Sequence, residues 1–257
     1  MKILSLNVNN FGGVCDKPLL NDYRFPNGRK DLATWGAEVD YWRESHKEII
    51  EKNVENIVCF IRDYDVVFLH EVDTNCFSWI LLTSRMKEEY VLELANGINK
   101  STIESGRKSI SCAFIKNNIN YNCDGIPNFS DSHRNVEIEI QGLSVIGIHM
   151  SYDLKDWINL RLRFEKIKKN VLIIGDLNVF DLGTSRREQF DMLLNEGAKD
   201  LWLEQKEDNR TPTANTLKRI DYALASDSII RAGAKEIIHN VTRRCNFTDH
   251  AAISVVI

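Results

Sequence analysis

The sequence predicts an α/β fold in which β-sheets pack against one another and helices cover their outer faces. Two observations support this prediction. Short apolar runs rich in β-branched residues, which are typical of buried strands, clearly outnumber the segments with helical periodicity. The helical segments also lie between the strand-like runs and form no separate block at either end of the chain. This order favours layered sheets with helices outside.

The predicted strands are distributed along the whole chain. Most are short, largely apolar runs, which indicates that they are buried. In Val136–Ile140 the apolar residues alternate with glutamates, so we expect one face of that strand to contact water. The predicted strands are Ile3–Leu6, Asp65–Leu69, Ile110–Ile115, Val136–Ile140, Leu143–Met150, Val171–Ile174, Arg219–Ala225 and Ala252–Ile257.

Three segments between these strands begin with a helix-start signal and continue with apolar residues at helical spacing. Two begin with a capping box, in which a serine and a glutamate three residues later each bond a backbone amide of the first turn. The third follows Asp153, an aspartate that can act as the N-cap. The predicted helical segments, with their caps, are Ser45–Ile61, Asp153–Ile167 and Ser185–Gly197.

Length and composition favour one globular domain that spans residues 1–257. The 257 residues would also allow two small domains, but the chain contains no repeat, low-complexity tract or Pro/Gly/Ser-rich linker. Its 43% hydrophobic residues are enough to fill a sizeable core, and its 27% charged residues are ordinary for a globular protein. The formal net charge of −4 and the pI near 5.9 argue against a protein that wraps nucleic acid through a broad basic face.

Cysteine usage and the distribution of apolar residues predict a cytoplasmic protein. The six cysteines are scattered and form no C-x-x-C pair, which disfavours both zinc sites and a disulfide framework. The apolar residues before Asn7 are too few for a signal peptide, and no apolar run approaches the length of a membrane span. We therefore expect a cytoplasmic monomer without membrane insertion.

Polar side chains that can bind a metal ion or a phosphate follow nearly every apolar run. Residues just past strand ends can converge on one rim of a sheet, and buried carboxylates need partners. Each of these residues taken alone has a structural explanation, such as a turn or a hydrogen-bonded core histidine. Their joint occurrence predicts one site, assembled from Asn7, Glu71, His149, Asp176, Asn178, Asp221, Asp249 and His250.

Five motifs around these residues resemble those of the endonuclease/exonuclease/phosphatase superfamily, in the same order. They are weak singly and specific as a set, and together they cover almost the whole chain. The resemblance implies a DNase I-like fold, a four-layer α/β sandwich with two central mixed β-sheets flanked by helices. The motifs are Leu6–Asn9, Phe68–Glu71, Gly175–Asn178, Arg219–Tyr222 and Thr248–His250.

The same resemblance implies a metal-dependent phosphoesterase. Glu71 and Asn7 would hold the main metal ion, and Asp249 would contribute to a second or shifted position. Hard oxygen ligands of this kind favour Mg²⁺ or Mn²⁺, whereas zinc prefers more histidine or cysteine. A bound metal ion would also supply the positive charge that faces the phosphate, despite the acidic composition.

The remaining motif residues are implied to act on water and phosphate. Asp176 would orient or activate the water, and Asn178 would donate to the phosphate. Asp221 would bond one ring nitrogen of His250, which fixes its tautomer and raises its pKa. Which of Asp176 and His250 accepts the proton of the water stays open. His149 matches the DNase I-like, sphingomyelinase and many phosphatase branches, which carry a histidine at this strand end. Apurinic-site nucleases of the bacterial exonuclease type carry a tyrosine there instead.

The substrate-binding residues are less well marked. Arg134 precedes a strand where family members often place a phosphate-contacting arginine, but an exposed loop arginine is an equally good explanation. Asn9, in the first motif, is the second candidate. In DNase I-like members a glutamate pairs with the second histidine; the matching region here is Arg107–Ser109, with Glu104 upstream, which departs from that pattern.

The leading interpretation is a nuclease that acts on DNA or RNA. A phosphatase or phosphodiesterase for a small molecule or lipid headgroup is the first alternative, and the acidic charge favours it. So does the segment Thr211–Lys218, which lacks the bulky aromatic residues of DNA-repair members. A catalytically silent binding protein is the remote alternative. Such proteins typically lose the counterparts of Glu71, Asp176 or His250, and all three residues are present here.

Overall fold

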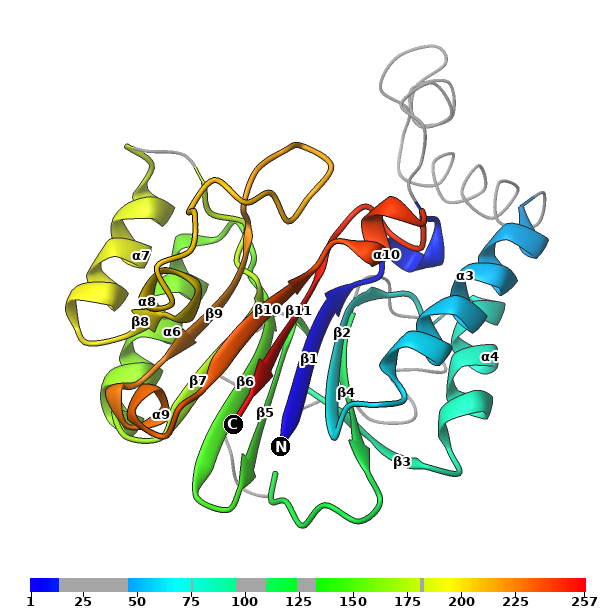
Figure 1. Ribbon diagram of the computed structural model, residues 1–257, viewed down its shortest axis with the longest axis horizontal. Helices are drawn as coiled ribbons and strands as arrows, with labels where there is room; N and C mark the ends of the chain where they lie inside the picture. The colour runs from blue at the N-terminus through cyan, green and yellow to red at the C-terminus, as the bar shows by residue number, and fades with distance from the viewer. Residues whose placement is uncertain (14–45, 75, 96–109, 124–132, 181–182) are drawn as a thin grey trace.

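Two β-sheets pack face to face in the computed structural model, and helices cover the outer face of each sheet (Figure 1). Both sheets are mixed, since each contains one parallel pair among antiparallel neighbours. The predicted four-layer α/β sandwich is therefore confirmed. The structure describes residues 1–13, 46–74, 76–95, 110–123, 133–180 and 183–257.

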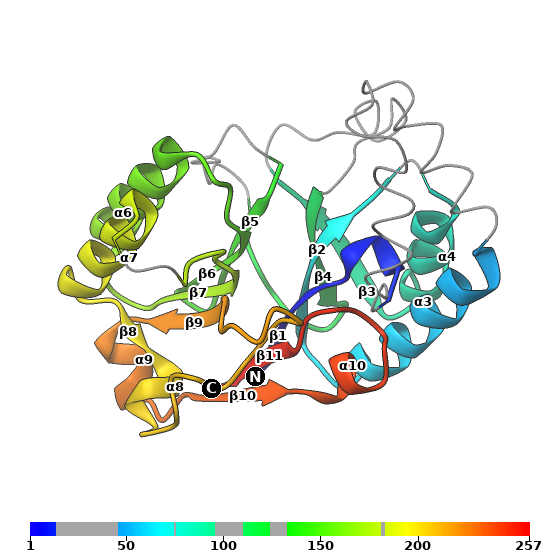
Figure 2. The same ribbon diagram turned by 90° about the horizontal axis from the view of Figure 1, so that it is seen from above.

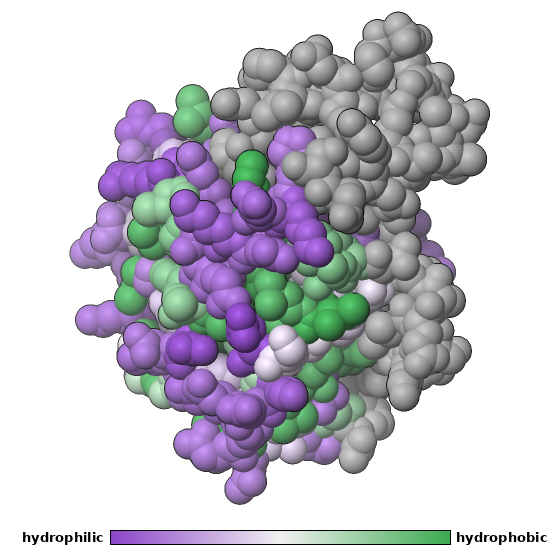
Figure 3. Space-filling view, turned by 90° about the vertical axis from the view of Figure 1, so that its right-hand side faces the viewer, coloured by the Kyte–Doolittle hydropathy of each residue, from purple (hydrophilic) through white to green (hydrophobic). Residues whose placement is uncertain are grey.

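The first sheet consists of β1 (Lys2–Asn7), β2 (Val66–Val72), β3 (Tyr90–Leu94), β4 (Ile110–Lys116), β10 (Lys235–His239) and β11 (Ala252–Val256). Their order is β10-β11-β1-β2-β4-β3, and only β1 and β2 run parallel. Helices α3 (Lys47–Ile61) and α4 (Phe77–Met86) cover the outer face (Figure 2). On the side of the molecule shown in Figure 3, hydrophilic residues lie beside a smaller hydrophobic area.

The second sheet consists of β5 (Asn135–Ile140), β6 (Leu143–His149), β7 (Val171–Asp176), β8 (Lys199–Asp200) and β9 (Asp221–Ala225). Their order is β5-β6-β7-β9-β8, and β6 and β7 run parallel. Helices α6 (Leu154–Ile167) and α7 (Ser185–Asn195) lie on its outer face (Figure 2). Four short helices complete the described elements: η1 (Asn9–Phe11), α8 (Leu201–Glu204), α9 (Asp227–Arg231) and α10 (Val241–Arg244).

Apolar residues on both faces of the central strands hold the layers together. On β7, Leu172 and Ile174 belong to the core that the two sheets share, whereas Ile173 packs with the helices of the outer layer. The sheets approach closely where Phe68 lies against Gly147, since a Cβ atom on Gly147 would meet the Phe68 ring at 1.9 Å. A fully buried Phe side chain contributes roughly 1.5–3 kcal/mol to folding.

Every predicted strand is present, but the predicted wet face of β5 is partly wrong. Glu139 is exposed as expected, whereas Glu137 is only 8% exposed. Arg163 explains the difference, because its Nε and Nη2 donate to the two carboxylate oxygens of Glu137 at 2.9 and 2.7 Å. Arg163 on helix α6 therefore pairs with the charge of Glu137, which the alternating pattern predicted to face water.

The helix starts agree with the predictions to within one residue. Asp153 caps α6 as expected and accepts from the amide of Lys155. At α7 the cap is Thr184 instead of Ser185: Thr184 has extended backbone angles and accepts from Arg187, while Ser185 is already helical. The N-cap of α3 is His46, and the predicted cap Ser45 lies outside the described residues. None of the described helices is long and apolar enough to cross a membrane.

Candidate active site

The strand register brings the predicted site residues to one edge of the sandwich. In the second sheet, His149 is the register partner of Asp176, and Asp176 is the partner of Asp221. In the first sheet, Asn7 at the end of β1 pairs with His70 on β2. The carboxyl ends of the two parallel pairs thus lie at this edge, together with the starts of β9 and β11.

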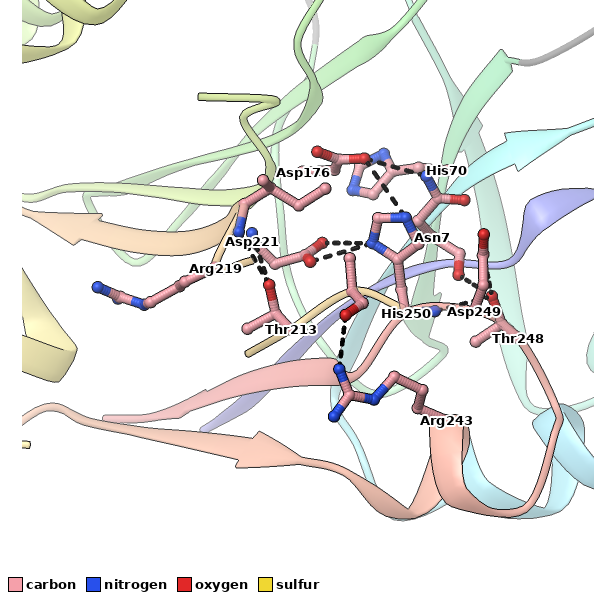
Figure 4. Close-up of polar contacts among 12 residues, drawn as sticks. Asn7, His70, Asp176, Thr213, Arg219, Asp221, Arg243, Thr248, Asp249 and His250 are labelled. Atoms are coloured by element: carbon pink, nitrogen blue, oxygen red, sulfur yellow. Dashed lines mark hydrogen bonds and ion pairs between the residues drawn. The ribbon is translucent and has the colours of Figure 1, made fainter. Parts of the chain in front are cut away.

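Asn7 connects the two sheets at the centre of the site (Figure 4). Its Nδ2 donates to Oδ2 of Asp176 at 3.1 Å, and its Oδ1 accepts from the backbone amide of Asn9 at 3.0 Å. The Thr248 hydroxyl donates to the backbone carbonyl of Asn7 at 2.7 Å. Asn7 therefore turns its amide nitrogen toward the carboxylates, and its oxygen, the atom predicted to bind a metal ion, is shared with the turn that follows β1.

Glu71 lies at an irregularity in β2. The register shifts between Leu69 and Val72, and Glu71 has a φ of 56°, in the left-handed region that non-glycine residues rarely adopt. This conformation directs its carboxylate toward the second sheet, where Oε1 lies 3.6 Å from Nε2 of His149. Strained backbone of this kind costs about 1–3 kcal/mol and clusters at functional sites.

His70, the residue before Glu71, was not among the predicted site residues. It is fully buried, with Nε2 2.9 Å from the Ser5 hydroxyl and Nδ1 2.8 Å from the Ser111 hydroxyl. Burial, followed by the charge of His250, lowers the pKa of His70 to about 3, so its ring is neutral. Only its position beside Glu71 could have drawn attention to it, because both partners come from other strands.

The Gly-Asp-x-Asn motif supplies Asp176 and Asn178 through a tight backbone turn. Gly175 has a φ of +150°, and a Cβ atom there would meet the carbonyl oxygen of Ile148 at 1.9 Å, so only glycine fits. Asn178 has a φ of 52°, and its amide donates to Oδ1 of Asp176 at 2.9 Å. Its side chain donates to the carbonyl of Met150, which directs it along the rim of the site.

His250 and Asp221 form the predicted pair. Nδ1 of His250 donates to Oδ2 of Asp221 at 3.0 Å, which leaves Nε2 directed at Oδ2 of Asp176, 3.9 Å away. The buried hydroxyl of Thr213 accepts from the backbone amides of Ile220 and Asp221, both at 3.0 Å. Thr213 thus holds the segment that carries Asp221; nothing in the sequence marked it as a supporting residue.

Negative charge is in excess at this edge. Burial first, and then the charge of Asp221, raises the pKa of Asp176; burial, Asp176 and Asp249 raise the pKa of Glu71. Burial alone would lower the pKa of His250, but Asp221, Asp176 and Asp249 raise it to about 10. Carboxylates that repel each other in a buried site fit a bound divalent cation.

Two carboxylates and a histidine come closest to a ready set of ligand atoms. Among the described residues, Asp176, Asp221 and His250 each offer an atom within 4.8 Å of the others. This set differs from the predicted metal ligands Asn7, Glu71 and Asp249. Within this set, Nδ1 of His250 already bonds the carboxylate of Asp221, so that pair is hydrogen-bonded within the protein.

The predicted substrate-binding residues lie beside this network. The backbone carbonyl of Arg134 accepts from the amide of His149 at 2.8 Å. Burial first, with a smaller contribution from the Arg134 charge, lowers the pKa of His149 to about 4, although Asp176 opposes the shift. Asn9 donates from its side chain to the carbonyl of Gly13 at 3.2 Å and so shapes the turn after β1. The region Arg107–Ser109 and Glu104 lie outside the described residues.

Comparison of the sequence with models of known protein families identifies the family of this chain. Residues 4–250 match the Endonuclease/Exonuclease/phosphatase family. The chain belongs to that family. It is a family of metal-dependent hydrolases that act on phosphoester bonds, so the resemblance predicted from the five motifs is confirmed. A search of curated proteins gives no match.

Solved structures of this fold align with nearly the entire chain. A humanized D. rerio TDP2 with 14 mutations has 16% identity and a TM-score of 0.60 over 99% of this chain and 97% of that one. The 3'-5' exonuclease NExo from Neisseria meningitidis has 15% identity and a TM-score of 0.60 over 100% and 99%. The endonuclease domain of TRAS1, a telomere-specific non-LTR retrotransposon, has 10% identity and a TM-score of 0.60 over 99% and 96%. These likenesses show the fold that family members share.

Proposed function

We propose that this chain is a Mg²⁺- or Mn²⁺-dependent nuclease that cleaves phosphodiester bonds in DNA or RNA. The observation that carries the proposal is the hydrogen-bonded pair of Asp221 and His250, directed at Asp176 within an edge that holds excess negative charge. We further propose that residues 1–257 form a single catalytic domain that works as a monomer, and that it works in the cytoplasm, which the scattered cysteines favour.

Glu71, Asp249 and Asn7 would hold the metal ion. A carboxylate at a raised pKa, a second carboxylate and an amide oxygen form the kind of hard donor set that Mg²⁺ and Mn²⁺ prefer. A divalent cation bound there would offset charge on the phosphate oxygens and lower the pKa of a coordinated water. The bulge at Glu71 supports this assignment, because strained backbone that directs a carboxylate inward has no evident benefit for packing.

Proton transfer falls to Asp176 and His250. Their facing atoms are 3.9 Å apart, so both lie within reach of one water, and either can accept its proton when that water attacks the phosphate. Asp221 keeps Nε2 of His250 directed at this position by holding Nδ1. Asn178 and His149 lie at the same edge, and together with Arg134 they would donate to phosphate oxygens.

The test is hydrolysis of supercoiled plasmid DNA, single-stranded RNA and bis-p-nitrophenyl phosphate in Mg²⁺, Mn²⁺ or EDTA. We expect cleavage of a nucleic acid that requires the metal ion and is lost in His250→Ala and Glu71→Gln. The matched control is Glu207→Gln, a change of the same chemistry at an exposed residue, which should retain full activity.

The alternatives give different results in the same assay. Hydrolysis of the small diester without cleavage of DNA or RNA would indicate a phosphatase or phosphodiesterase for a small molecule or lipid headgroup, which the net charge of −4 favours. No hydrolysis of any substrate would indicate a silent binding protein. Activity that survives in both His250→Ala and Glu71→Gln would refute the proposed site.

A further inference from the structure

The exposed aromatic side chains of the described residues are found in one place. Nearly all described Phe, Tyr and Trp side chains are buried or partly buried, and the two exposed ones are Tyr152 and Phe180, at 69% and 36%. Both flank Asn178: the Tyr152 hydroxyl donates to its Oδ1 at 3.3 Å, and Phe180 follows it by two residues in the chain. Among the described residues, both exposed aromatic rings lie at the rim of the candidate site, and this gathering of exposed rings indicates a role in binding.

Each ring carries a cationic group on one face. The Arg186 guanidinium lies 4.4 Å from the centroid of the Tyr152 ring. The Lys218 ammonium lies 3.3 Å from the centroid of the Phe180 ring. Lys218 belongs to the segment that supports Asp221, since the amides of Thr213 and Ala214 both donate to its carbonyl. The rim therefore alternates flat apolar surfaces with positive charges beside an otherwise acidic site.

We propose that Tyr152 and Phe180 form a subsite on which unpaired bases of a single-stranded nucleic acid stack next to the scissile phosphodiester. This inference rests on the proposed nuclease function and deepens it. Base stacking on aromatic rings is tolerant of sequence because every base has a π-face, and positive charges beside the rings attract the phosphates between the bases. Bases in a duplex already stack on each other, so the subsite favours unpaired strands over paired ones.

The geometry also accounts for the overall acidity of the chain. A broad basic surface is unnecessary when stacking and two local cations position the strand. The segment Thr211–Lys218 contains no aromatic residue, and its exposed large apolar side chain is Leu217, at 75%. The aromatic surface lies instead after β6 and β7, on the side of Asn178.

Binding of two labelled probes tests this inference in the His250→Ala background, which prevents cleavage during the measurement. One probe is a single-stranded oligothymidylate, and the other is a sugar–phosphate chain of the same length without bases. Replacement of both Tyr152 and Phe180 by alanine should weaken binding of the first probe about tenfold or more, because one stacked base contributes a factor of this order. Binding of the second probe should not change.

Two further variants separate stacking from other roles. Tyr152→Phe keeps the ring and removes the hydroxyl that reaches Asn178, so it should bind the oligothymidylate as well as the parent does. Ile80→Ala removes an equally exposed apolar side chain on α4 and should have no effect. Thermal unfolding of each variant checks that the fold is intact, which we expect because truncation of exposed rings opens no core.

The outcomes distinguish this inference from the nuclease proposal itself. An equal loss of affinity for both probes, no loss for either, or the same loss in Tyr152→Phe would overturn the stacking subsite and leave the nuclease proposal standing. Failure of the parent chain to bind the oligothymidylate, while it still hydrolyses the small diester, would also overturn the subsite. Absence of any phosphoester hydrolysis would overturn the proposed function.

Discussion

Two buried ionic clusters lie on either side of the short segment Arg219–Asp221, and they are built on different principles. In the first, Arg219 makes two hydrogen bonds of 2.7 Å to the carboxylate of Asp200, and Glu236 lies 3.9 Å from its Nη2. In the second, Asp221 bonds His250 and faces Asp176 across the strand register. Both clusters thus combine buried carboxylates with a cationic side chain, and the residues Arg219 and Asp221 that anchor them are two positions apart in the chain.

The difference lies in how charge is balanced. In the Arg219 cluster, one guanidinium matches one carboxylate, and burial raises the pKa of Glu236 to about 8, so the second carboxyl is neutral near pH 7. In the Asp221 cluster, Asp176, Glu71 and Asp249 add carboxylates that His250 alone cannot offset. We call the Arg219 cluster closed, because its charges balance within the protein, and the Asp221 cluster open, because its carboxylates exceed its cations. A closed cluster stabilises the fold, whereas an open one can accept a cation and a substrate from outside.

The largest effect should follow from a change that removes negative charge from the open cluster. Asp176→Asn should lower kcat/KM for the cleaved substrate by about 10²–10⁴-fold, because a positioned acid or base contributes that much. The free energy of unfolding should stay the same or increase, since a buried carboxylate among carboxylates is unfavourable. Initial rates and urea unfolding measure the two effects. A large loss of stability would mean that Asp176 belongs to the structural framework.

Breaking the closed cluster should have the opposite result. Arg219→Met leaves Asp200 buried without its partner and should lower the free energy of unfolding by about 3–5 kcal/mol. The matched control is Arg210→Met, which breaks a similar two-bond pair with Asp208 that lies in solvent. That variant should unfold at the same urea concentration as the parent. Equal destabilisation by both changes would show that burial does not distinguish the two pairs.

The open cluster could be predicted from the sequence better than the closed one. Asn7, Glu71 and Asp176 stand at the ends of apolar runs, so the strand pattern alone indicates where they gather. Asp200 and Arg219 pair across 19 positions between a two-residue strand and a loop, and no local pattern reports such a contact. The supporting histidine His70 depends in the same way on partners from two other strands.

The strands of the fold also show that contacts between distant parts of the chain are hard to predict from one sequence. Strands buried on both faces were predicted with nearly correct ends, because their side chains form continuous apolar runs. The edge strands β3, β8 and β10 were missed, since they are short or only partly buried and their sequences mix apolar with charged residues. Pairing with a neighbour, which a single sequence does not display, makes them strands.

Metal binding should stabilise the open cluster and leave the closed one unaffected. At a Mn²⁺ concentration about 100 times the Kd, the free energy of unfolding should rise by about 2.7 kcal/mol, because the ion binds only the folded chain. The double variant Glu71→Gln and Asp249→Asn should lose this increase, whereas Arg219→Met should keep it despite its lower starting stability. Thermal unfolding with and without Mn²⁺ gives the answer. An increase that persists in the double variant would place the ion elsewhere.

The last effect concerns the proton on Glu236, and its size depends on pH. This carboxyl is 2% exposed, and burial raises its pKa in the folded chain from 4.5 to about 8, although Arg219 opposes the shift. Between these two values the folded chain holds a proton that the unfolded chain has released. The stability that this group contributes is therefore complete below about pH 4.5 and is lost as the pH rises toward 8, at up to about 1.4 kcal/mol per pH unit.

Glu236→Gln removes that proton and should flatten the dependence of the unfolding free energy on pH across this window. Urea unfolding at several pH values between 4.5 and 8 measures the slope for the parent and for the variant. Glu204→Gln, a change at an exposed glutamate, should leave the slope as it is. A parent slope that Glu236→Gln does not alter would mean that Glu236 stays ionised beside Arg219. The closed cluster would then carry one uncompensated negative charge, and the contrast with the catalytic edge would be weaker than the structure indicates.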